Sequence, residues 1–252
     1  MSKKVKTYLK ELVKKLGAVL GSNLVGVYLQ GSSAQKDYRD NKSDLDVIAV
    51  TRKPIPDNQK NVLGFELEHK KIPVPSAGLD LMIITKSTAQ HPTPEPEYEF
   101  WFSTGEGWDT SIDKKGSTSE VLIFLATCSK QARTIFGLDS REVFSPVPYK
   151  MLLQTLIDIL KWHRKKTLDN FHDPMGQYSI LNASRAWMYA EDKKLGSKTD
   201  GGKWVLAREP NNELVKNALL VRDGKSKISP GAKEVDLFLQ RVLGICKERL
   251  KI

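Results

Sequence analysis

The sequence is poor in the residues that crosslink or metallate small proteins. It has two cysteines, Cys128 and Cys246, which are far apart in the chain. Its four histidines are scattered, with no ligand spacing between any two of them: His69, His91, His163 and His172. These counts argue against a disulfide framework and against a zinc site. They favour buried thiols in a reducing compartment.

Long apolar runs are also missing. No run approaches the roughly 20 residues that a membrane-spanning helix needs. The first residues, MSKKVKTYLKELVKKLGAVLG, are basic and amphipathic, without an apolar signal core or a small-residue cleavage site. We therefore expect a folded N-terminal helix, no membrane segment and a cytoplasmic location.

Positive charge is in excess. Lysine and arginine number 40 against 30 aspartates and glutamates, which gives a net charge of +10. Such a surplus is typical of nucleic-acid binders, but no nucleic-acid-binding motif accompanies it. Lysines that solvate helical faces, together with a basic pocket for a polyphosphate, account for the charge more simply. Nucleic acid stays the second interpretation.

The first part of the chain alternates helical and strand patterns. Apolar residues at three- and four-residue intervals predict a helix over 5–20, and apolar runs predict strands over 24–29, 44–50 and 78–85. Two further segments follow. Residues 86–116, rich in proline, glycine, glutamate and aromatics, predict a long functional loop. Residues 117–137 predict a helix with Ser117 or Ser119 as its cap and Gly137 as its stop.

The second part reads as helices only. "VFSPVPY" (143–149) has two prolines in its last four positions and indicates a boundary. The helices predicted beyond it cover 149–166, 174–194, 202–208, 212–222 and 231–250. With 252 residues the chain has room for two modest domains, which we place at 1–146 and 147–252.

Two carboxylates stand at the start of an otherwise apolar strand. Asp44 and Asp46 are separated by one residue, so they share a face while Leu45 and Val47 point to a core. The two carboxylates repel each other unless a cation lies between them, and Mg²⁺ binds one or two carboxylates and substrate phosphates. Asp80, within "GLDLMIIT", is costly as an isolated charge and could supply a third ligand. For Asp44 alone, a turn residue is the simpler interpretation.

A small-residue turn precedes this pair. Gly31, Ser32 and Ser33 follow the apolar run over 24–29. The backbone N–H groups and hydroxyls of such a turn can cradle phosphate oxygens. The turn is weak evidence alone and strong evidence when an Asp-x-Asp strand follows about a dozen residues later.

These residues carry a resemblance. "GSS…SDLDVIAV" resembles the Gly-Ser and Asp-x-Asp signature of the polymerase-beta-type nucleotidyltransferase superfamily. "YSILNASRAWMYAEDKKLGSKTDGGKWVLAREP" (178–210) looks like the helical domain of the aminoglycoside 3″/9-adenylyltransferases, and "EVFSPVPY" (142–149) resembles their inter-domain segment. The likeness covers most of the chain, with a loose middle.

The resemblance implies a fold and a set of site residues. The fold is α+β: a nucleotidyltransferase domain with a mixed sheet flanked by helices, then an all-α helical bundle. The cofactors are Mg²⁺, two ions in the family's pattern, with ATP as co-substrate. The metal ligands would be Asp44, Asp46 and Asp80. The nucleotide-binding residues would be Gly31, Ser32, Ser33, Arg185, Lys198 and Lys203.

The sequence departs from the family at the proposed catalytic base. The family has a glutamate on the strand where this chain has Asp80. Aspartate is one methylene shorter and can still bind a metal. A general base must come within about 3 Å of the proton that it takes. Asp80 as metal ligand is therefore better supported than Asp80 as the only base.

The resemblance also implies the reaction and its acceptor. AMP would pass from ATP to a hydroxyl of an aminoglycoside or aminocyclitol, streptomycin or spectinomycin, with release of pyrophosphate and antibiotic resistance as the result. Polycationic drugs need an acidic, partly aromatic pocket. The candidates are Asp173, just before the helix predicted over 174–194, and six residues of the segment 86–116: Glu97, Glu99, Trp101, Glu106, Trp108 and Asp109. Each of these could equally be a solvated loop residue.

Two other functions stay open at this point. One is a nucleotidyltransferase with another acceptor, a protein or an RNA, which the positive charge favours. The other is a non-catalytic homologue that only binds nucleotide, against which the three aspartates argue. We expect a monomer.

Overall fold

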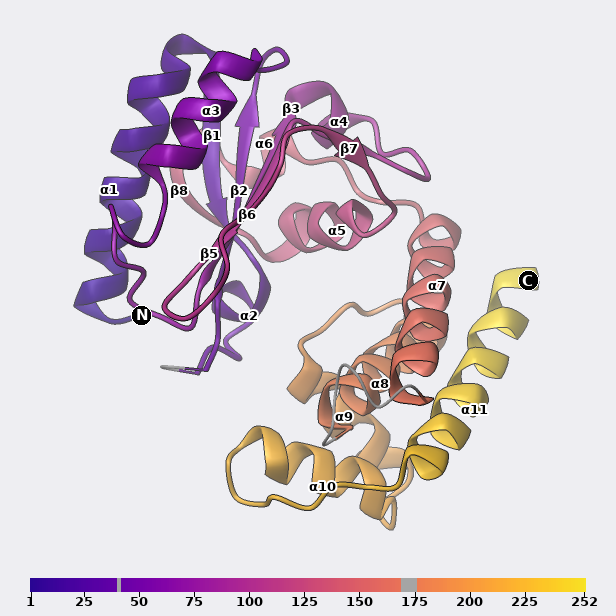
Figure 1. Cartoon of the computed structure of the whole chain (residues 1–252). Coiled ribbons are helices and arrows are strands. Elements are labelled where there is room, and N and C mark those ends of the chain that lie inside the picture. The colour runs from indigo at the N-terminus through magenta and orange to yellow at the C-terminus, as the bar shows by residue number, and fades with distance from the viewer. Residues whose placement is uncertain (40–41, 169–175) are drawn as a thin grey trace. The chain divides into compact units, whose positions relative to one another are not determined.

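The computed structural model describes residues 1–39, 42–168 and 176–252. These residues divide into two compact units, Met1–Val147 and Pro148–Ile252. The first unit contains the β-sheet and the second is helical (Figure 1). The predicted α+β class is confirmed.

The first unit is built on a six-stranded sheet with strand order β6-β5-β3-β2-β1-β8. Its strands are β1 (Leu24–Leu29), β2 (Leu45–Thr51), β3 (Leu79–Thr85), β5 (Phe100–Thr104), β6 (Ser111–Asp113) and β8 (Arg133–Gly137). β2 and β3 are parallel, and the other neighbours in the sheet are antiparallel. The sheet is therefore mixed, as the resemblance implied.

One face of the sheet packs against α1 (Lys3–Leu20) and α3 (Asp57–Glu66), which lie on the same side of it in Figure 1. Every second residue of the central strands points to this side, so that Val47, Leu81 and Phe102 join one apolar core with Leu12 and Leu16 of α1. These five side chains are almost completely buried. The core fixes which side chains of the same strands must point the other way.

The other face is covered by α5 (Val121–Gln131) and α6 (Ser140–Val143). The ring of Trp101 packs edge-on against Phe124 of α5, and Tyr28 packs edge-on against Phe144, directly after α6. Asp46 and Asp80 belong to this face, each as the second residue of its strand. The remaining short elements of the unit are η1 (Gly21–Asn23), α2 (Gly31–Ala34), α4 (Lys86–Gln90), β4 (Glu97–Tyr98) and β7 (Gly116–Ser117).

Two predictions for the middle of the chain are wrong. Residues 86–116 are not one long loop, since they contain α4, β4, β5 and β6. Alternate burial along Phe100–Thr104 is the strand signal that the flanking prolines and glycines obscured. The segment 117–137 is helical only as α5 and ends as strand β8. Glu120, rather than Ser117 or Ser119, holds the N-cap position.

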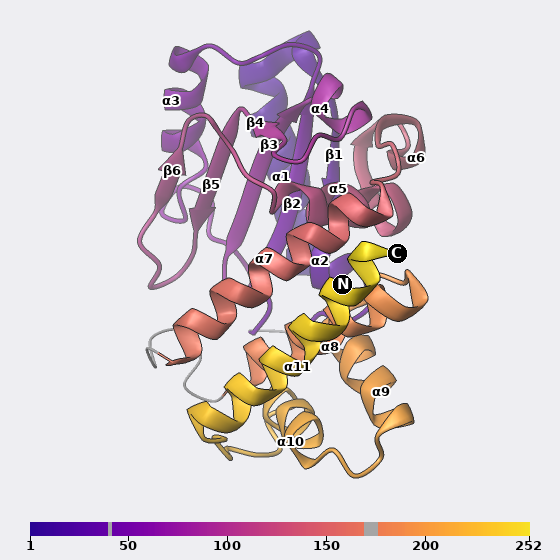
Figure 2. The ribbon, with the colours of Figure 1, turned by 90° about the vertical axis from the view of Figure 1, so that its right-hand side faces the viewer.

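The second unit consists of helices in its described residues. They are α7 (Tyr149–Leu168), α8 (Gln177–Asp192), α9 (Lys198–Arg208), α10 (Glu213–Arg222) and α11 (Ala232–Lys251). α7 and α11 lie side by side (Figure 2). Each matches a predicted helix, although 174 and 175 lie outside the described residues. Across the described part of the chain, no helix combines the length and the apolar character that crossing a membrane requires.

Candidate active site

A pair of carboxylates lies side by side on the central strands. Asp46 of β2 and Asp80 of β3 are register partners in the parallel pair. Neighbouring strands are about 4.8 Å apart, and partners in register point to the same face. The structure therefore brings together two residues that are 34 positions apart in the sequence, on the face that α5 covers.

Asp44 lies two residues before Asp46 along the chain. It lies directly before β2 and is partly exposed, like Asp46, while Leu45 between them is buried. The backbone beside it is tied to the start of β3, because Leu45 N donates to the Gly78 carbonyl at 2.8 Å. Its negative charge acts on Asp80. The three predicted aspartates thus belong to one end of the β2–β3 pair.

The glycine turn packs directly against Asp46. Gly31 has φ +58°, in the left-handed region, and a Cβ added to it would lie only 2.5 Å from Asp46 Cγ. Gln30 N donates to the Asp46 carbonyl at 2.9 Å and ties the turn to β2. Glycine is therefore required at this position both by its φ angle and by the approach of the carboxylate.

The serine hydroxyls of this turn have unused hydrogen-bonding capacity. Ser32 Oγ and Ser33 Oγ are buried without a hydrogen-bond partner among the residues that the structure describes. An unsatisfied buried hydroxyl costs about 1–3 kcal/mol, and such groups are uncommon unless a ligand or water satisfies them. Their position beside Asp46 fits a turn that binds phosphate oxygens.

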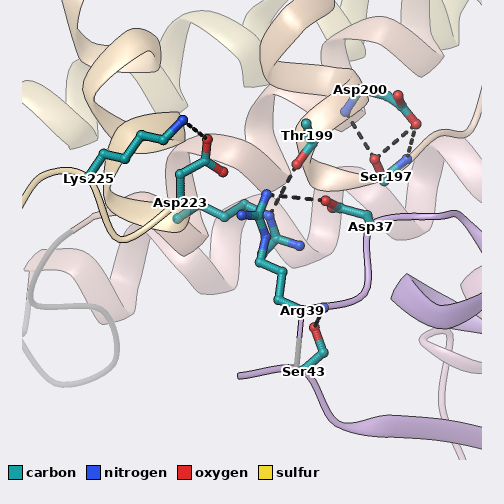
Figure 3. A network of polar contacts seen from close by, with 9 residues as sticks. Asp37, Arg39, Ser43, Ser197, Thr199, Asp200, Asp223 and Lys225 are labelled. Atoms are coloured by element: carbon teal, nitrogen blue, oxygen red, sulfur yellow. Dashed lines mark hydrogen bonds and ion pairs between the residues drawn. The ribbon is translucent and has the colours of Figure 1, made fainter. Parts of the chain in front are cut away.

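Asp37 and Arg39, which follow the turn, are tied to the turn and to the residue before Asp44. Asp37 N donates to the Ser32 carbonyl at 3.0 Å, and the Asp37 carboxylate lies 3.5 Å from the Arg39 guanidinium. Arg39 N donates to Ser43 Oγ at 3.0 Å (Figure 3). These contacts fix where the chain enters β2 and hence where Asp44 stands.

Asp80 is held by two donors from β5. Trp101 Nε1–H donates to Asp80 Oδ1 at 2.6 Å, and the Ser103 hydroxyl donates to the same oxygen at 3.1 Å. Burial raises the pKa of the Asp80 carboxyl, and the Asp44 charge adds to this, while the two hydrogen bonds lower it. Trp101 was expected to line the acceptor pocket, and Ser103 was not predicted as a site residue. The alternation of Trp101 and Ser103 with buried residues marks one face of a strand, and the register of β5 with β3 makes that face the neighbour of Asp80.

Two further groups, on and before α5, interact electrostatically with the carboxylate pair. Burial raises the pKa of Glu120, directly before α5, and the Asp80 charge adds to the shift. Burial also raises the pKa of the Cys128 thiol, with a contribution from the Asp46 charge. Cys128 and Cys246 are free and buried, as predicted. A buried thiol with a raised pKa is a poor nucleophile.

The carboxylate pair fits a magnesium ion that is shared with a substrate. Within residues 1–39, 42–168 and 176–252, no three His, Cys, Asp or Glu side chains form a ready-made metal cluster. Mg²⁺ binds one or two carboxylates at about 2.0–2.1 Å and takes its other ligands from water and phosphates. Asp46 and Asp80 in register, beside the unsatisfied hydroxyls of Ser32 and Ser33, supply such an open site. Asp44 as a third ligand stays a prediction.

The predicted acceptor residues are distributed unevenly. The Trp108 ring lies against Gly78, where an added Cβ would be 2.5 Å from Trp108 Cζ3, and so it stands near the strand end that carries Asp80. Trp108 and Asp109 are exposed, as an acceptor site requires. Glu97 is exposed on the separate β4–β7 sheet, which does not include the aspartates. Asp173 lies outside the described residues.

The second unit carries the predicted phosphate-binding cations. Lys198 is the first residue of α9, whose N-cap Ser197 forms a capping box with Asp200 (Figure 3). Its Nζ lies 3.8 Å from the centroid of the Tyr178 ring. The backbone of Arg185 packs against Gly201 of α9, while Lys203 is exposed. Lys198 and Arg185 thus belong to the α8–α9 pair.

Comparison with known proteins gives three findings. Residues 142–243 match the family model described as the C-terminal domain of aminoglycoside adenylyltransferases. The chain is 26% identical to a spectinomycin 9-adenylyltransferase of Enterococcus faecalis, over 81% of this chain and 80% of that protein. It is 24% identical to the enzyme of that name from Staphylococcus aureus, over 78% and 76%.

A solved structure shares the fold. It is an Enterococcus spectinomycin adenyltransferase with ATP and spectinomycin, which matches with a TM-score of 0.74 at 21% identity over 96% of this chain and 98% of that one. Taken with the carboxylate pair beside the glycine turn, these findings identify an enzyme that transfers nucleotides. Over most of its length the chain resembles the aminoglycoside adenylyltransferases, and its residues 142–243 match their C-terminal domain.

Proposed function

We propose that this enzyme transfers AMP from ATP to a hydroxyl of spectinomycin in a Mg²⁺-dependent reaction and thereby confers resistance. The observation that carries the proposal is the Asp46–Asp80 register pair beside the Gly31 turn. It occurs in a chain whose relatives are named spectinomycin 9-adenylyltransferases, which favours spectinomycin over streptomycin as the acceptor.

Asp46 and Asp80 would hold the metal, with Asp44 as a further ligand. When bound, Mg²⁺ offsets the negative charge of the triphosphate and of the leaving pyrophosphate. The Gly31 turn would receive phosphate oxygens on its backbone N–H groups and on the hydroxyls of Ser32 and Ser33, which lack partners within the described part of the chain.

The reaction needs one proton transfer. The acceptor hydroxyl attacks the α-phosphorus of ATP, the bond to the bridging oxygen breaks, and pyrophosphate leaves. We assign the hydroxyl proton to Asp80, whose Oδ1 is occupied by Trp101 and Ser103, so that Oδ2 is the oxygen for this step. Burial raises the pKa of Asp80, which makes it a better base than an exposed aspartate.

The other predicted residues keep proposed roles. Lys198, with Arg185 and Lys203, would bind the ATP phosphates. Trp108 would pack on the drug and Asp109 would pair with one of its amines, because both side chains are exposed. Glu97 and Asp173 stay predicted acceptor contacts. A monomeric state and a cytoplasmic location likewise stay predictions of the sequence.

The test is an acceptor panel with purified protein, ATP and Mg²⁺. Pyrophosphate release should require spectinomycin, and streptomycin, RNA and an unfolded model protein should give none. Asp46→Asn should abolish release. Asp158→Asn, which disturbs an exposed ion pair with Lys161 and an exposed hydrogen bond from Gln154, should leave it unchanged.

Other outcomes identify the alternatives. Release that depends on RNA or on a protein would make the chain a nucleotidyltransferase with another acceptor, which its charge of +10 would then explain. Tight ATP binding without release under any condition would indicate a homologue that binds nucleotide without chemistry. Either result would overturn the proposed acceptor.

A further inference from the structure

We propose that Trp101 and Ser103 are positioning residues for the reaction: they lock the Asp80 carboxylate in one orientation and reserve Oδ2 for the metal and the acceptor proton. Both donate to Asp80 Oδ1, Trp101 through its indole N–H at 2.6 Å and Ser103 through its hydroxyl at 3.1 Å. The inference deepens the proposed function and depends on it for its kinetic consequences.

The sheet dictates this arrangement. Ser103 is the register partner of Asp80 across the antiparallel β3–β5 pair, and Trp101 is the partner of Met82. Trp101 is therefore the diagonal neighbour of Asp80 on the same face, at a distance that an aromatic side chain can span. The two donors reach one oxygen from two positions of β5, so they hold the carboxylate in one plane and leave its other oxygen free of both.

The indole is itself held in place. Its ring packs edge-on against Tyr98 at 5.4 Å and against Phe124 at 5.9 Å, measured between centroids. Tyr98 in turn donates its hydroxyl to Asp113 at 2.5 Å. A donor fixed by two aromatic contacts loses little side-chain entropy when its hydrogen bond forms. The orientation of Asp80 is thus determined by the packing of the sheet and α5.

The short side chain of Asp80 explains why its carboxylate benefits from two fixed hydrogen-bond donors. Aspartate is one methylene shorter than glutamate, so its reach to a substrate hydroxyl tolerates less rotation of the carboxylate. Charge-assisted hydrogen bonds are the strong ones in proteins, and a displacement of about 1 Å in a reacting group can cost about 100-fold in rate. Rigid support from Trp101 and Ser103 compensates for the shorter side chain.

The kinetic test uses Trp101→Phe, which keeps the ring contacts and removes the donor, and Ser103→Ala. We expect kcat to fall about 10- to 100-fold in Trp101→Phe and less in Ser103→Ala, with KM for ATP changed less than about 3-fold. Ser103→Thr, which retains a hydroxyl, should restore activity. The matched controls are Trp162→Phe on α7 and Ser111→Ala on β6, both exposed and both expected to keep wild-type kcat.

A second readout is independent of turnover. In an NMR spectrum of the free protein, the Trp101 indole N–H proton should be shifted downfield by its short bond to a carboxylate. That signal, assigned by its loss in Trp101→Phe, should move upfield in Asp80→Ala. Mg²⁺ with a non-hydrolysable ATP analogue should shift it in wild type and not in Asp80→Ala.

The outcomes separate this inference from the proposed function. Wild-type kcat in Trp101→Phe, or an indole N–H chemical shift that is the same in Asp80→Ala as in wild type, overturns the positioning role even if AMP transfer is confirmed. If wild-type protein transfers no AMP to any acceptor, the proposed function fails, and the indole signal still decides whether Trp101 holds Asp80. Circular dichroism and thermal unfolding of each variant show that a loss of activity is not a loss of fold.

Discussion

Substitution of Gly31 by alanine should remove activity while leaving the fold largely intact. A Cβ at position 31 would overlap the Asp46 carboxylate, 2.5 Å from Cγ and 3.0 Å from Cβ. The atoms in the way belong to a side chain, so the carboxylate moves and the sheet does not. A displacement of about 1 Å at this carboxylate corresponds to about a 100-fold loss of kcat/KM, or about 2.7 kcal/mol of transition-state stabilisation.

The stability cost of the same change is separable. Gly31 has φ +58°, and a left-handed conformation costs an alanine about 1–2 kcal/mol. Gly21 has φ +53° and nothing within 4 Å of an added Cβ, so Gly21→Ala carries the backbone cost without a clash. The two variants should lose a similar few degrees of melting temperature, and only Gly31→Ala should lose activity.

The assay is pyrophosphate release at varied ATP, paired with thermal unfolding of both variants. Wild-type kcat/KM in Gly31→Ala would refute the argument that the turn and the Asp46 carboxylate form one site. An equal loss of activity in Gly21→Ala would attribute the effect to general destabilisation instead.

Three further predictions concern catalysis and stability. Asp46→Asn should reduce Mg²⁺-dependent ATP binding at least 10-fold by calorimetry, and unchanged binding would remove Asp46 from the metal site. Lys60→Ala leaves Glu99 buried without its ion pair at 3.7 Å, so urea unfolding should show a loss of about 3–5 kcal/mol, and less than half of that when Glu99→Gln is added. The hydrogen bond from Arg241 lowers the pKa of Glu209, so the stabilisation from this pair is complete above about pH 4.5 and is lost as pH falls further. Arg241→Gln should therefore weaken the pH dependence of the melting temperature in that range. An unaltered pH dependence would contradict a stabilising role of the pair.

The sequence predicted most of what depends on local pattern. The helices of the second unit, the strands that carry Asp46 and Asp80, and the burial of both cysteines follow from periodicity and spacing. Trp187 is buried and packs against the Trp204 ring, as a core residue does.

What failed depends on pairing between distant segments. β5 is a strand because it is hydrogen-bonded to β3 on one side and to β6 on the other. The sequence pattern of residues 86–116 does not predict these strand partners. The donors to Asp80 were missed for the same reason, since register across β3 and β5 decides that Ser103 faces Asp80. Glu99, which the sequence grouped with acceptor-pocket acids, is buried and accepts from Ile55 N at 3.0 Å, a structural role.

The proposed function requires the carboxylate pair of β2 and β3 for AMP transfer to spectinomycin. The most direct measurement is the mass of spectinomycin after incubation with the purified chain, ATP and Mg²⁺. We expect a product heavier by one adenylyl group, formed by wild type and by Asp158→Asn and absent with Asp46→Asn. Unmodified spectinomycin in the presence of folded, ATP-binding protein would contradict it.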